Sequence, residues 1–582
     1  MFCMASPDIS LELKAKCISR KTPSPSARGI DPSAKRPSCC AVRSASERLP
    51  GPFLPLAELV SEEQPLNISD RITNHKSNLI FAVKLLFIMI LLPVRIIIAT
   101  VLQFACLKHK RLKVTPRCFN FKGVNRMSIE NFDNVYQANR ERFLEELKEF
   151  LKFKSIGTEP ECQRECQECA AWLKEHLNAI GLETRLLETP GLPVVYAEKK
   201  LNPTKPTLLF YGHYDVQPVD PLELWQTDPF EPVERDGRLY ARGAQDNKGQ
   251  LMYFIKALEE SIKNNMLQYN VKLVIEGEEE NSSRGISAVV SEWSDLLKAD
   301  VLLVCDTDTF SPDCGTISMG LRGIIFMTVK LSGPRMDLHS GAHGGAIPNP
   351  ATELARLVST LHDADGRIAV KGYYDQVDPV SDEERKLIEN TPFNLEDYTR
   401  TVGVRPEWGE PGFSPLERIG FRPTVELNGI HSGYGGPGAK TIIPAEAFAK
   451  ITSRLVASQD PEHALDLLKK HLESHAPAGL KLEFSEMGAG GKALKVPLSS
   501  AYVKQATKIL EELFDGKVYF CWQGGSVPIV SSLAEVSGAE PVLVGFGLTE
   551  DNIHAPNESF SLEQFRKGFI FASMFLSAAS AK

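Results

Sequence analysis

An alternation of short apolar runs with amphipathic helical patterns, which begins near Met127, constrains the fold more than any other feature of the sequence. A helical pattern opens this part as ENFDNVYQANRERFLEELKEFL, and strand-like runs follow as PTLLFYG, VKLVIEG, DVLLVCD and EPVLVGFG. Short apolar runs bounded by turn residues are typical of buried strands. Strands that alternate with helices build a sheet with helices on its faces, so the sequence predicts an α/β fold class.

The size and charge of the chain narrow the range of functions. The 582 residues suffice for two or three domains with a substantial core. A formal net charge of −8 gives no sign of the basic patch that nucleic-acid binding requires. Twelve cysteines are too few for a disulfide scaffold in a chain of this length. We therefore expect a globular protein with no nucleic-acid partner.

The part of the chain before Met127 has a different character. Residues 1–70 are rich in Ser, Pro, Lys and Arg without a sustained period, which predicts a disordered extension. Residues 71–126 combine a strongly apolar stretch at 79–107 with a basic flank. The apolar stretch exceeds the ~20 residues that cross a bilayer, but three residues interrupt it: Lys84, Pro93 and Arg95. We expect membrane contact through 79–107, as a tilted span or a hairpin in one leaflet, with a buried helix as the alternative. The basic flank predicts a cytoplasmic catalytic domain.

One cysteine motif has the spacing of an iron–sulfur site. Cys162, Cys166 and Cys169 form a C-x3-C-x2-C pattern. The same period continues through apolar residues, namely Leu173, Leu177 and Ile180. These positions form one face of an amphipathic helix, and free cysteine suits a core face. We therefore interpret the motif as a buried helix that ends near Gly181 rather than as a cluster site.

Polar residues follow the strand-like runs where each run ends. They are His213 and Asp215, Glu279 and Glu280, Asp306 and Asp308, and His554, with Asp246 in a glycine-flanked turn. A run of charges alone most often marks a solvated loop. Ligands of open α/β sheets, however, gather at the carboxyl ends of the strands. Imidazole together with several carboxylates suits zinc or manganese, and two such ions can share a bridging carboxylate.

An ordered set of motifs resembles the zinc dipeptidase and carnosinase family, which also contains aminoacylases, desuccinylases and glutamate carboxypeptidases. The motifs run from YGHYDVQP through ARGAQDNKG, EGEEENSS, CDTD, GLRG, DLHSGAHGG, GPGAKTIIP, SRLV and GGSVP to HAPNES. The resemblance covers Met127 to Lys582 and implies a two-domain di-metal exopeptidase fold. A mixed-sheet catalytic domain at 127–319 and 494–582 would then be interrupted by a smaller α+β lid and dimerisation domain at 320–493.

The resemblance also implies roles for individual residues near the metals. Two divalent ions per subunit are expected, zinc first and manganese second. Their ligands would be His213, Asp246, Glu280, Asp306 and His554, with Asp246 bridging the ions and preceding a cis peptide bond to Asn247. Asp215 would orient His213, and Glu279 would be the general base. Glu278 is expected to point away, into solvent or a hydrogen bond.

Further family positions concern the substrate. Arg454, Thr441 and Ser526 match residues that hold the substrate, the first two through its carboxylate. His339 matches an oxyanion donor that comes from the partner subunit in dimers, so a homodimer through the lid is expected. Dipeptidases of this family tend to carry Arg-Glu before Gly-Gly-Ser, whereas Trp522 and Gln523 stand here. Neutral Gln523 would weaken recognition of a free substrate amine.

The expected function is metal-dependent hydrolysis of dipeptides or short peptides with a free C-terminal carboxylate. An N-acyl amino acid amidohydrolase with the same metals is the alternative, and a membrane-attached binding protein with an inactive site is a more distant one. Glycosylation sequons at Asn281 and Asn557 lie beside Glu280 and His554. A glycan there would obstruct the site, which agrees with a cytoplasmic catalytic domain.

Overall fold

The computed structural model describes residues 128–406 and 408–578. The predicted disordered extension at 1–70 and the predicted membrane segment at 71–126 lie outside the described residues. Within the described part, no helix combines the length and apolar character needed to cross a membrane.

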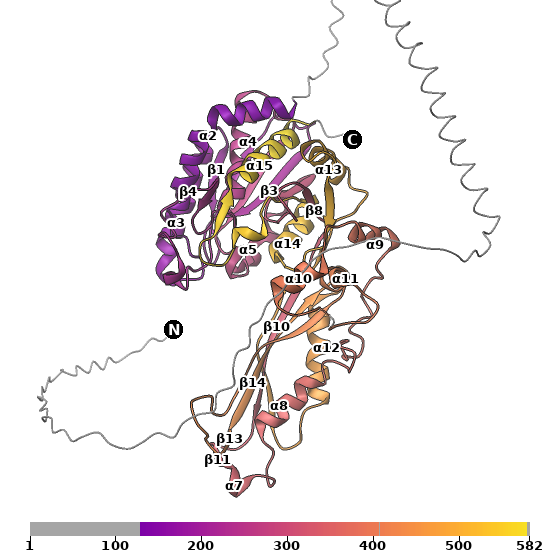
Figure 1. The fold of residues 1–582 in the computed structure, drawn as a ribbon. Helices are drawn as coiled ribbons and strands as arrows, with labels where there is room; N and C mark the ends of the chain where they lie inside the picture. Colours follow the sequence, from indigo (N-terminus) through magenta and orange to yellow (C-terminus); the bar gives the residue numbers. More distant parts are fainter. Residues whose placement is uncertain (1–127, 407, 579–582) are drawn as a thin grey trace, which may run out of the picture. The chain divides into compact units, whose positions relative to one another are not determined.

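A mixed sheet of eight strands forms the centre of the larger part of the molecule (Figure 1). The strands follow one another across the sheet in the order β1 (Glu183–Leu187), β2 (Val194–Lys199), β6 (Asn270–Glu276), β3 (Thr207–His213), β7 (Val301–Val304), β18 (Glu540–Leu543), β8 (Gly315–Ser318) and β17 (Val518–Cys521). The four strand-like runs of the sequence are the neighbouring strands β6, β3, β7 and β18, which are mutually parallel. Their apolar side chains are buried on both faces, as continuous apolar runs require.

Helices cover this sheet. They are α2 (Ile129–Leu151), α3 (Gln163–Ala179), α4 (Lys248–Lys263), α13 (Ala501–Leu513), α14 (Pro528–Ser537) and α15 (Leu562–Ser577). The Ser128 hydroxyl accepts the Asn131 N–H and begins α2, in the arrangement of a capping box. Helix α15 packs against α4 and α2, while α3 packs against β1 and β2. The predicted α/β fold class is confirmed.

The cysteine motif lies where its period predicted. Cys166 and Cys169 are fully buried on one face of α3, together with Leu173 and Leu177. Cys162 precedes the helix at its N-cap, and Gly181 follows the helix with a positive φ of 96°. Burial raises the pKa of the Cys166 thiol to about 12, which keeps this sulfur protonated. This face of α3 packs in the hydrophobic core, as the sequence interpretation of the cysteine motif predicted.

A second, four-stranded antiparallel sheet comes from the chain between β8 and β17. Its order is β12 (Thr424–Ser432), β14 (Glu446–Leu455), β10 (Gly323–Ser332) and β15 (Lys481–Gly491). Alternate residues of β10 are buried, namely Ile325, Met327, Val329 and Leu331. Helices α8 (Pro350–Ser359) and α12 (Pro461–Ser474) pack on this sheet. The mixed sheet thus draws its strands from two separated stretches of the chain. The exact domain boundaries predicted from the sequence stay a prediction.

Candidate metal centre

Three neighbouring parallel strands bring most of the predicted metal ligands to one edge of the mixed sheet. His213 is the last residue of β3, Asp306 follows β7 by two residues, and Glu280 lies in the short helix η3 (Glu279–Asn281) after β6. Because parallel strands end at the same edge, these side chains converge. Asp246 joins them from the turn before α4, and His554 from the segment after β18.

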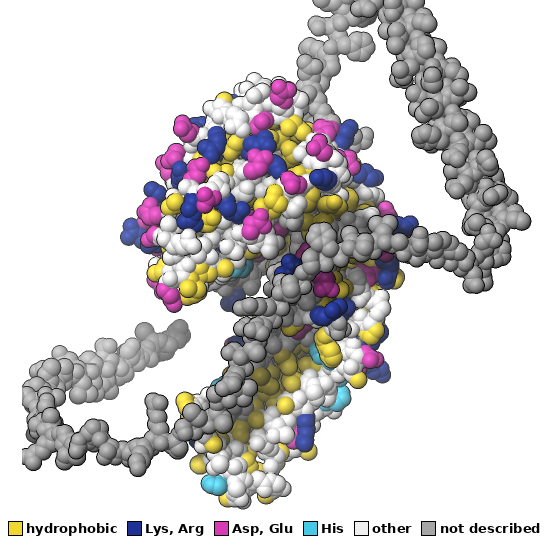
Figure 2. All heavy atoms as spheres, viewed as in Figure 1, with side chains coloured by type: hydrophobic (Ala, Val, Ile, Leu, Met, Phe, Trp, Pro, Cys, Tyr) yellow, Lys and Arg dark blue, Asp and Glu magenta, His cyan; other side chains and the backbone are white. Residues whose placement is uncertain are grey.

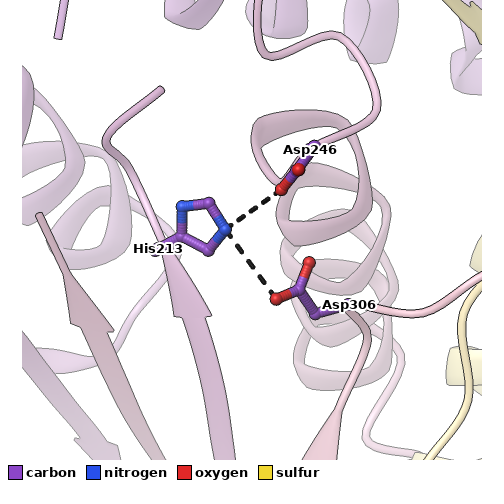
Figure 3. A group of neighbouring side chains, drawn as sticks. All are labelled: His213, Asp246 and Asp306. Atoms are coloured by element: carbon purple, nitrogen blue, oxygen red, sulfur yellow. Dashed lines mark ion pairs between the residues drawn. The ribbon is translucent and has the colours of Figure 1, made fainter. Parts of the chain in front are cut away.

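The five predicted ligands form two groups that share Asp246. In the first group, His213 Nε2 lies 3.2 Å from Asp246 Oδ1 and 3.8 Å from Asp306 Oδ2 (Figure 3). In the second group, His554 Nε2 lies 2.9 Å from Asp246 Oδ2 and 3.3 Å from Glu280 Oε2. The candidate ligand atoms within each group are all within 4.8 Å of one another. Asp246 therefore offers one carboxylate oxygen to each group, as a bridging ligand does.

The donor set fits divalent cations. His213 Nε2 and Glu280 Oε1 are buried atoms that form no hydrogen bond. Unpaired buried polar atoms are rare in native proteins and call for a partner such as an ion. A set of two imidazoles and three carboxylates matches the preferences of zinc and manganese. Divalent cations would therefore satisfy both buried atoms.

Asp215 organises the first histidine and the glutamate turn together. Its Oδ1 lies 3.3 Å from His213 Nδ1, consistent with the expected orienting role. The same carboxylate accepts the backbone N–H groups of Glu279 and Glu280, at 3.2 and 3.0 Å. Sequence reasoning did not anticipate these backbone contacts. Asp215 is fully buried, so its position is fixed by the surrounding structure.

The electrostatics of the centre are dominated by crowded carboxylates. Burial raises the pKa of Glu279 well above its usual value, and Asp306 and Glu280 add to the effect. Burial raises the pKa of Asp306 to about 7. The carboxylates of Asp246 and Glu280 raise the pKa of His554 to about 10. Positive charge from bound cations would relieve this repulsion.

Two buried glutamates that sequence reasoning missed support the centre. Glu558 Oε1 accepts the backbone N–H groups of Gln245 and Asp246, at 3.0 and 3.2 Å, and its Oε2 accepts Arg242 Nη1 at 2.8 Å. It thereby holds the turn that carries Asp246. Glu276, at the end of β6, accepts hydrogen bonds from Tyr211 and Ser283, and burial raises its pKa to about 8. The only feature of the sequence that could have indicated Glu276 was its position at the end of a strand-like run.

Several smaller expectations can be compared with the structure. The Asp246–Asn247 peptide bond is cis, and the Asn247 amide donates to Asp306 at 2.8 Å. Glu278 points away from the ligands and accepts the backbone N–H groups of Leu192 and Gly285, at 3.2 and 3.1 Å. Of the two outcomes expected for Glu278, the structure contains the hydrogen bond.

Arg454 and Ser526 lie together beside the ligands. The guanidinium Nη1 of Arg454 donates to Ser526 Oγ at 2.7 Å. Ser526 lines a cleft of about 180 Å³ that also contains Asp246, Glu279 and His554. A guanidinium at this place can bind a carboxylate bidentately.

The structure brings Thr441 beside His339 and not beside Arg454. His339 ends the short strand β11 (Leu338–His339), which pairs with β13 (Ile442–Ile443), and Ser340 N–H donates to the Thr441 carbonyl at 3.0 Å. Both residues are exposed and precede β14, whereas Arg454 lies near the far end of that strand. The eight residue-to-residue steps along β14 from Glu446 to Arg454 span roughly 26 Å. In Figure 1, β11 and β13 lie at the end of the four-stranded sheet that is remote from β8.

Comparison with known proteins identifies the family. Residues 209–577 match the model of "Peptidase family M20/M25/M40". The chain belongs to this family. Among its curated relatives, the Cys-Gly metallodipeptidase dug1 of Schizosaccharomyces pombe is 28% identical over 461 residues, which cover 76% of this chain and 96% of the relative. The Beta-Ala-His dipeptidase of Rattus norvegicus is 27% identical over 471 residues, covering 77% and 95%.

A solved structure supports the same assignment. The M20 family metallo-carboxypeptidase Sso-CP2 of Sulfolobus solfataricus is 33% identical, with a TM-score of 0.68, and the match covers 75% of this chain and 98% of that one. The resemblance stated from the sequence motifs and the two-domain fold that it implied are therefore confirmed. This M20-family chain carries its two ligand groups at the carboxyl edge of the mixed sheet.

Proposed function

We propose that this chain is a metal-dependent dipeptidase that hydrolyses the peptide bond of dipeptides with a free C-terminal carboxylate. The observation that carries the proposal is the pair of ligand groups sharing Asp246, with Glu279 and the Arg454–Ser526 pair beside them. The names of the relatives, a Cys-Gly metallodipeptidase and a Beta-Ala-His dipeptidase, support the same reaction.

The five candidate ligands would bind two cations. His213, Asp246 and Asp306 would hold one cation, while Asp246, Glu280 and His554 would hold the other. When bound, these cations supply Lewis-acid chemistry and lower the pKa of water. Zinc is our first choice and manganese the second, because both suit imidazole and carboxylate ligands.

Glu279 would carry the proton. Its carboxylate accepts a proton from the attacking water while the water oxygen forms a bond to the carbonyl carbon of the substrate. When the carbon–nitrogen bond breaks, Glu279 returns that proton to the leaving amine. Glu279 lines the same cleft as Asp246 and His554, so it lies beside both ligand groups and can exchange a proton with the water and with the leaving amine there. Arg454 and Ser526 would bind the substrate's carboxylate and fix which bond lies beside Glu279.

His339 and Thr441 would act on a second subunit, as an oxyanion donor and a carboxylate contact. Their distance along the four-stranded sheet from Arg454 supports a contribution in trans rather than within one chain. Strands β10, β12 and β15 of the four-stranded sheet expose large hydrophobic side chains, among them Phe326, Leu427, Ile430 and Met487. Figure 2 shows hydrophobic side chains gathered where β10 and β14 lie. A homodimer through the lid would cover such side chains and complete both sites.

We also propose that the catalytic domain faces the cytoplasm, with membrane contact through 79–107. The amide nitrogen of Asn557 donates to the Leu224 carbonyl at 2.9 Å, and its oxygen accepts the Gln226 N–H at 2.8 Å. An asparagine used in this way leaves no place for a glycan on the folded protein, which supports a compartment without glycosylation.

The test is release of free amino acids by the full 582-residue chain, purified in mild detergent. Dipeptides and matched N-acetyl amino acids would be compared, with EDTA and with added Zn²⁺ or Mn²⁺. We expect metal-dependent cleavage of the dipeptides. A preference for the acetylated substrates would instead assign the chain to the N-acyl amino acid amidohydrolases. Bound metal without activity on either class would refute the dipeptidase proposal.

A further inference from the structure

A second cavity lies directly beside the metal cleft. Its volume is about 270 Å³, far above the roughly 10–15 Å³ that one water molecule needs. The two hollows share Asp308 and Gln523 in their walls. Apart from this shared edge, the cavity is mainly apolar, and its large apolar side chains include Phe310, Ile388, Ile419, Phe421, Phe520 and Trp522.

The inserted part of the chain builds one wall of this cavity. Ile388 belongs to α9 (Asp382–Glu389), and Ile419 and Phe421 belong to α11 (Pro415–Phe421). The rest of the lining includes Phe520 of β17 and Trp522, whose ring contacts Phe421 in a tilted arrangement with the ring centroids 4.6 Å apart.

Asp308 is the only charged residue among those that line the cavity. Its Oδ1 accepts a hydrogen bond from Gln245 Nε2 at 3.1 Å. Within residues 128–406 and 408–578, no lysine, arginine or histidine forms an ion pair with it. Gly547 permits this placement, since a Cβ there would lie 2.2 Å from Asp308 Oδ1 and 1.9 Å from Gln245 Nε2. The carboxylate of Asp308 can therefore accept hydrogen bonds from a cationic group of a ligand.

The place of Arg454 and Ser526, which are proposed to bind the substrate's carboxylate, indicates which part of a substrate lies near this cavity. Ser526, the partner of Arg454, lines the metal cleft but not the second cavity. The metal cleft contains Asp308 and Gln523 as well as Ser526 and the ligand groups, so a dipeptide whose carboxylate binds Arg454 and Ser526 would place its first residue in the part of this cleft where Asp308 and Gln523 lie. The ammonium group and the side chain of that first residue therefore meet the shared wall.

We propose that Asp308 binds the substrate's free ammonium group and that the adjoining cavity receives a large apolar side chain of the substrate's first residue. The inference rests on the proposed dipeptidase function and names its substrate class: dipeptides that begin with a bulky apolar residue. An N-acyl group would fill the same cavity but would leave Asp308 unpaired.

The test compares kcat/KM of the full-length, metal-loaded chain on three substrates: Leu-Ala, Gly-Ala and 4-methylpentanoyl-Ala, which is Leu-Ala without its amine. We expect Leu-Ala to exceed Gly-Ala by about 10- to 100-fold, from burial of the leucine side chain. Asp308→Asn should lower kcat/KM for Leu-Ala by about 10- to 100-fold, and leave 4-methylpentanoyl-Ala unchanged, since only the charged amine loses its partner. Asp313→Asn, an exposed aspartate outside the cavity, is the matched control and should change neither.

A second variant tests the cavity without touching Asp308. Ile419→Trp fills the space and should bring the ratio of kcat/KM for Leu-Ala to that for Gly-Ala close to one, while the metal content stays as in the wild type. Leu201→Trp, on an exposed loop, is the control. Equal cleavage of Leu-Ala and Gly-Ala by the wild type would overturn the inference and leave the dipeptidase proposal intact. So would an equal loss on the amine and des-amino substrates in Asp308→Asn. Cleavage of none of the three substrates by the metal-loaded wild type would overturn both.

Discussion

The carboxylate of Asp215 accepts the backbone N–H of Glu280 at 3.0 Å, while its other oxygen lies 3.3 Å from His213 Nδ1. One buried side chain thus joins the end of β3 to the turn after β6. His213 and Glu280 belong to different ligand groups, so Asp215 couples the placement of both.

Replacing Asp215 by asparagine tests this coupling. The substituted side chain would keep the size of the original but lose the negative charge that faces His213, and its amide group could not accept on both sides. We expect metal affinity or kcat/KM to fall by about 10- to 100-fold, the usual effect of losing a residue that orients a ligand. Metal titration by calorimetry and steady-state kinetics measure the two effects. Glu278→Gln is the control, since Glu278 accepts backbone N–H groups away from the ligands. Unchanged affinity and kcat/KM in Asp215→Asn would refute the coupling.

Glu279→Gln separates proton transfer from metal binding. Glu279 lies in the metal cleft but belongs to neither ligand group, so the variant should bind both ions as the wild type does. Loss of a general base lowers kcat by about 10²- to 10⁴-fold. The measurements are metal content by elemental analysis and kcat on a dipeptide. Glu280→Gln provides the contrast, because it should lose metal as well as activity. A Glu279→Gln enzyme with near wild-type kcat would remove Glu279 from the mechanism.

The sequence pointed to the candidate ligands more directly than to the residues that support them. The candidate ligands stand out because β3, β6, β7 and β18 are short apolar runs that each lead into polar residues, and because the motifs resemble a known family. The order of those strands across the sheet could not be found, since apolar runs indicate burial but not neighbours. Glu558 was missed for a related reason: it binds the Asp246 N–H from 312 residues away, and no local pattern marks such a contact.

Thr441 shows a further limit of reasoning from motifs. It was grouped with Arg454 because both match positions that hold a substrate carboxylate, yet β14 separates them in the chain. The order of motifs along the sequence does not indicate how far apart their residues lie in the folded chain. Under the proposed function, Thr441 and Arg454 contact one substrate across two subunits, and the proposed homodimer would then complete each site.

Mixing two inactive variants tests that arrangement. His339→Ala and Arg454→Ala should each lower kcat/KM strongly when alone. In a mixed dimer, the site on the His339→Ala chain keeps Arg454 and receives an intact histidine from its partner. Random exchange of subunits should then restore about one quarter of the wild-type activity, because half of the dimers are mixed and each has one complete site. Co-expression with two affinity tags isolates the mixed species. Restoration would be absent if His339 acted within its own chain.

Acid stability should depend on Glu259, which lies far from the chemistry in α4. This side chain is nearly buried, and it pairs with Lys256 at 2.9 Å and with Arg142 at 2.9 Å. Burial alone would raise its pKa, but Lys256 and Lys263 outweigh burial and lower the pKa to about 2 from its usual 4.5. Because the folded value is the lower one, the charged carboxylate stabilises the fold above pH 4.5. That contribution, about 3 kcal/mol, is lost as the pH falls from 4.5 toward 2.

Glu259→Gln should therefore unfold more easily at pH 7, since it leaves Lys256 buried with one carboxylate partner fewer. The difference from the wild type should shrink between pH 4.5 and pH 2, where the wild-type carboxylate becomes protonated. Urea denaturation followed by circular dichroism at pH 7, 5 and 3 measures the trend. Glu145→Gln, which removes an exposed pair with Lys148, should change stability little at any of these pH values. A pH-independent difference for Glu259→Gln would show that packing, rather than the charge of Glu259, stabilises the contact between α2 and α4.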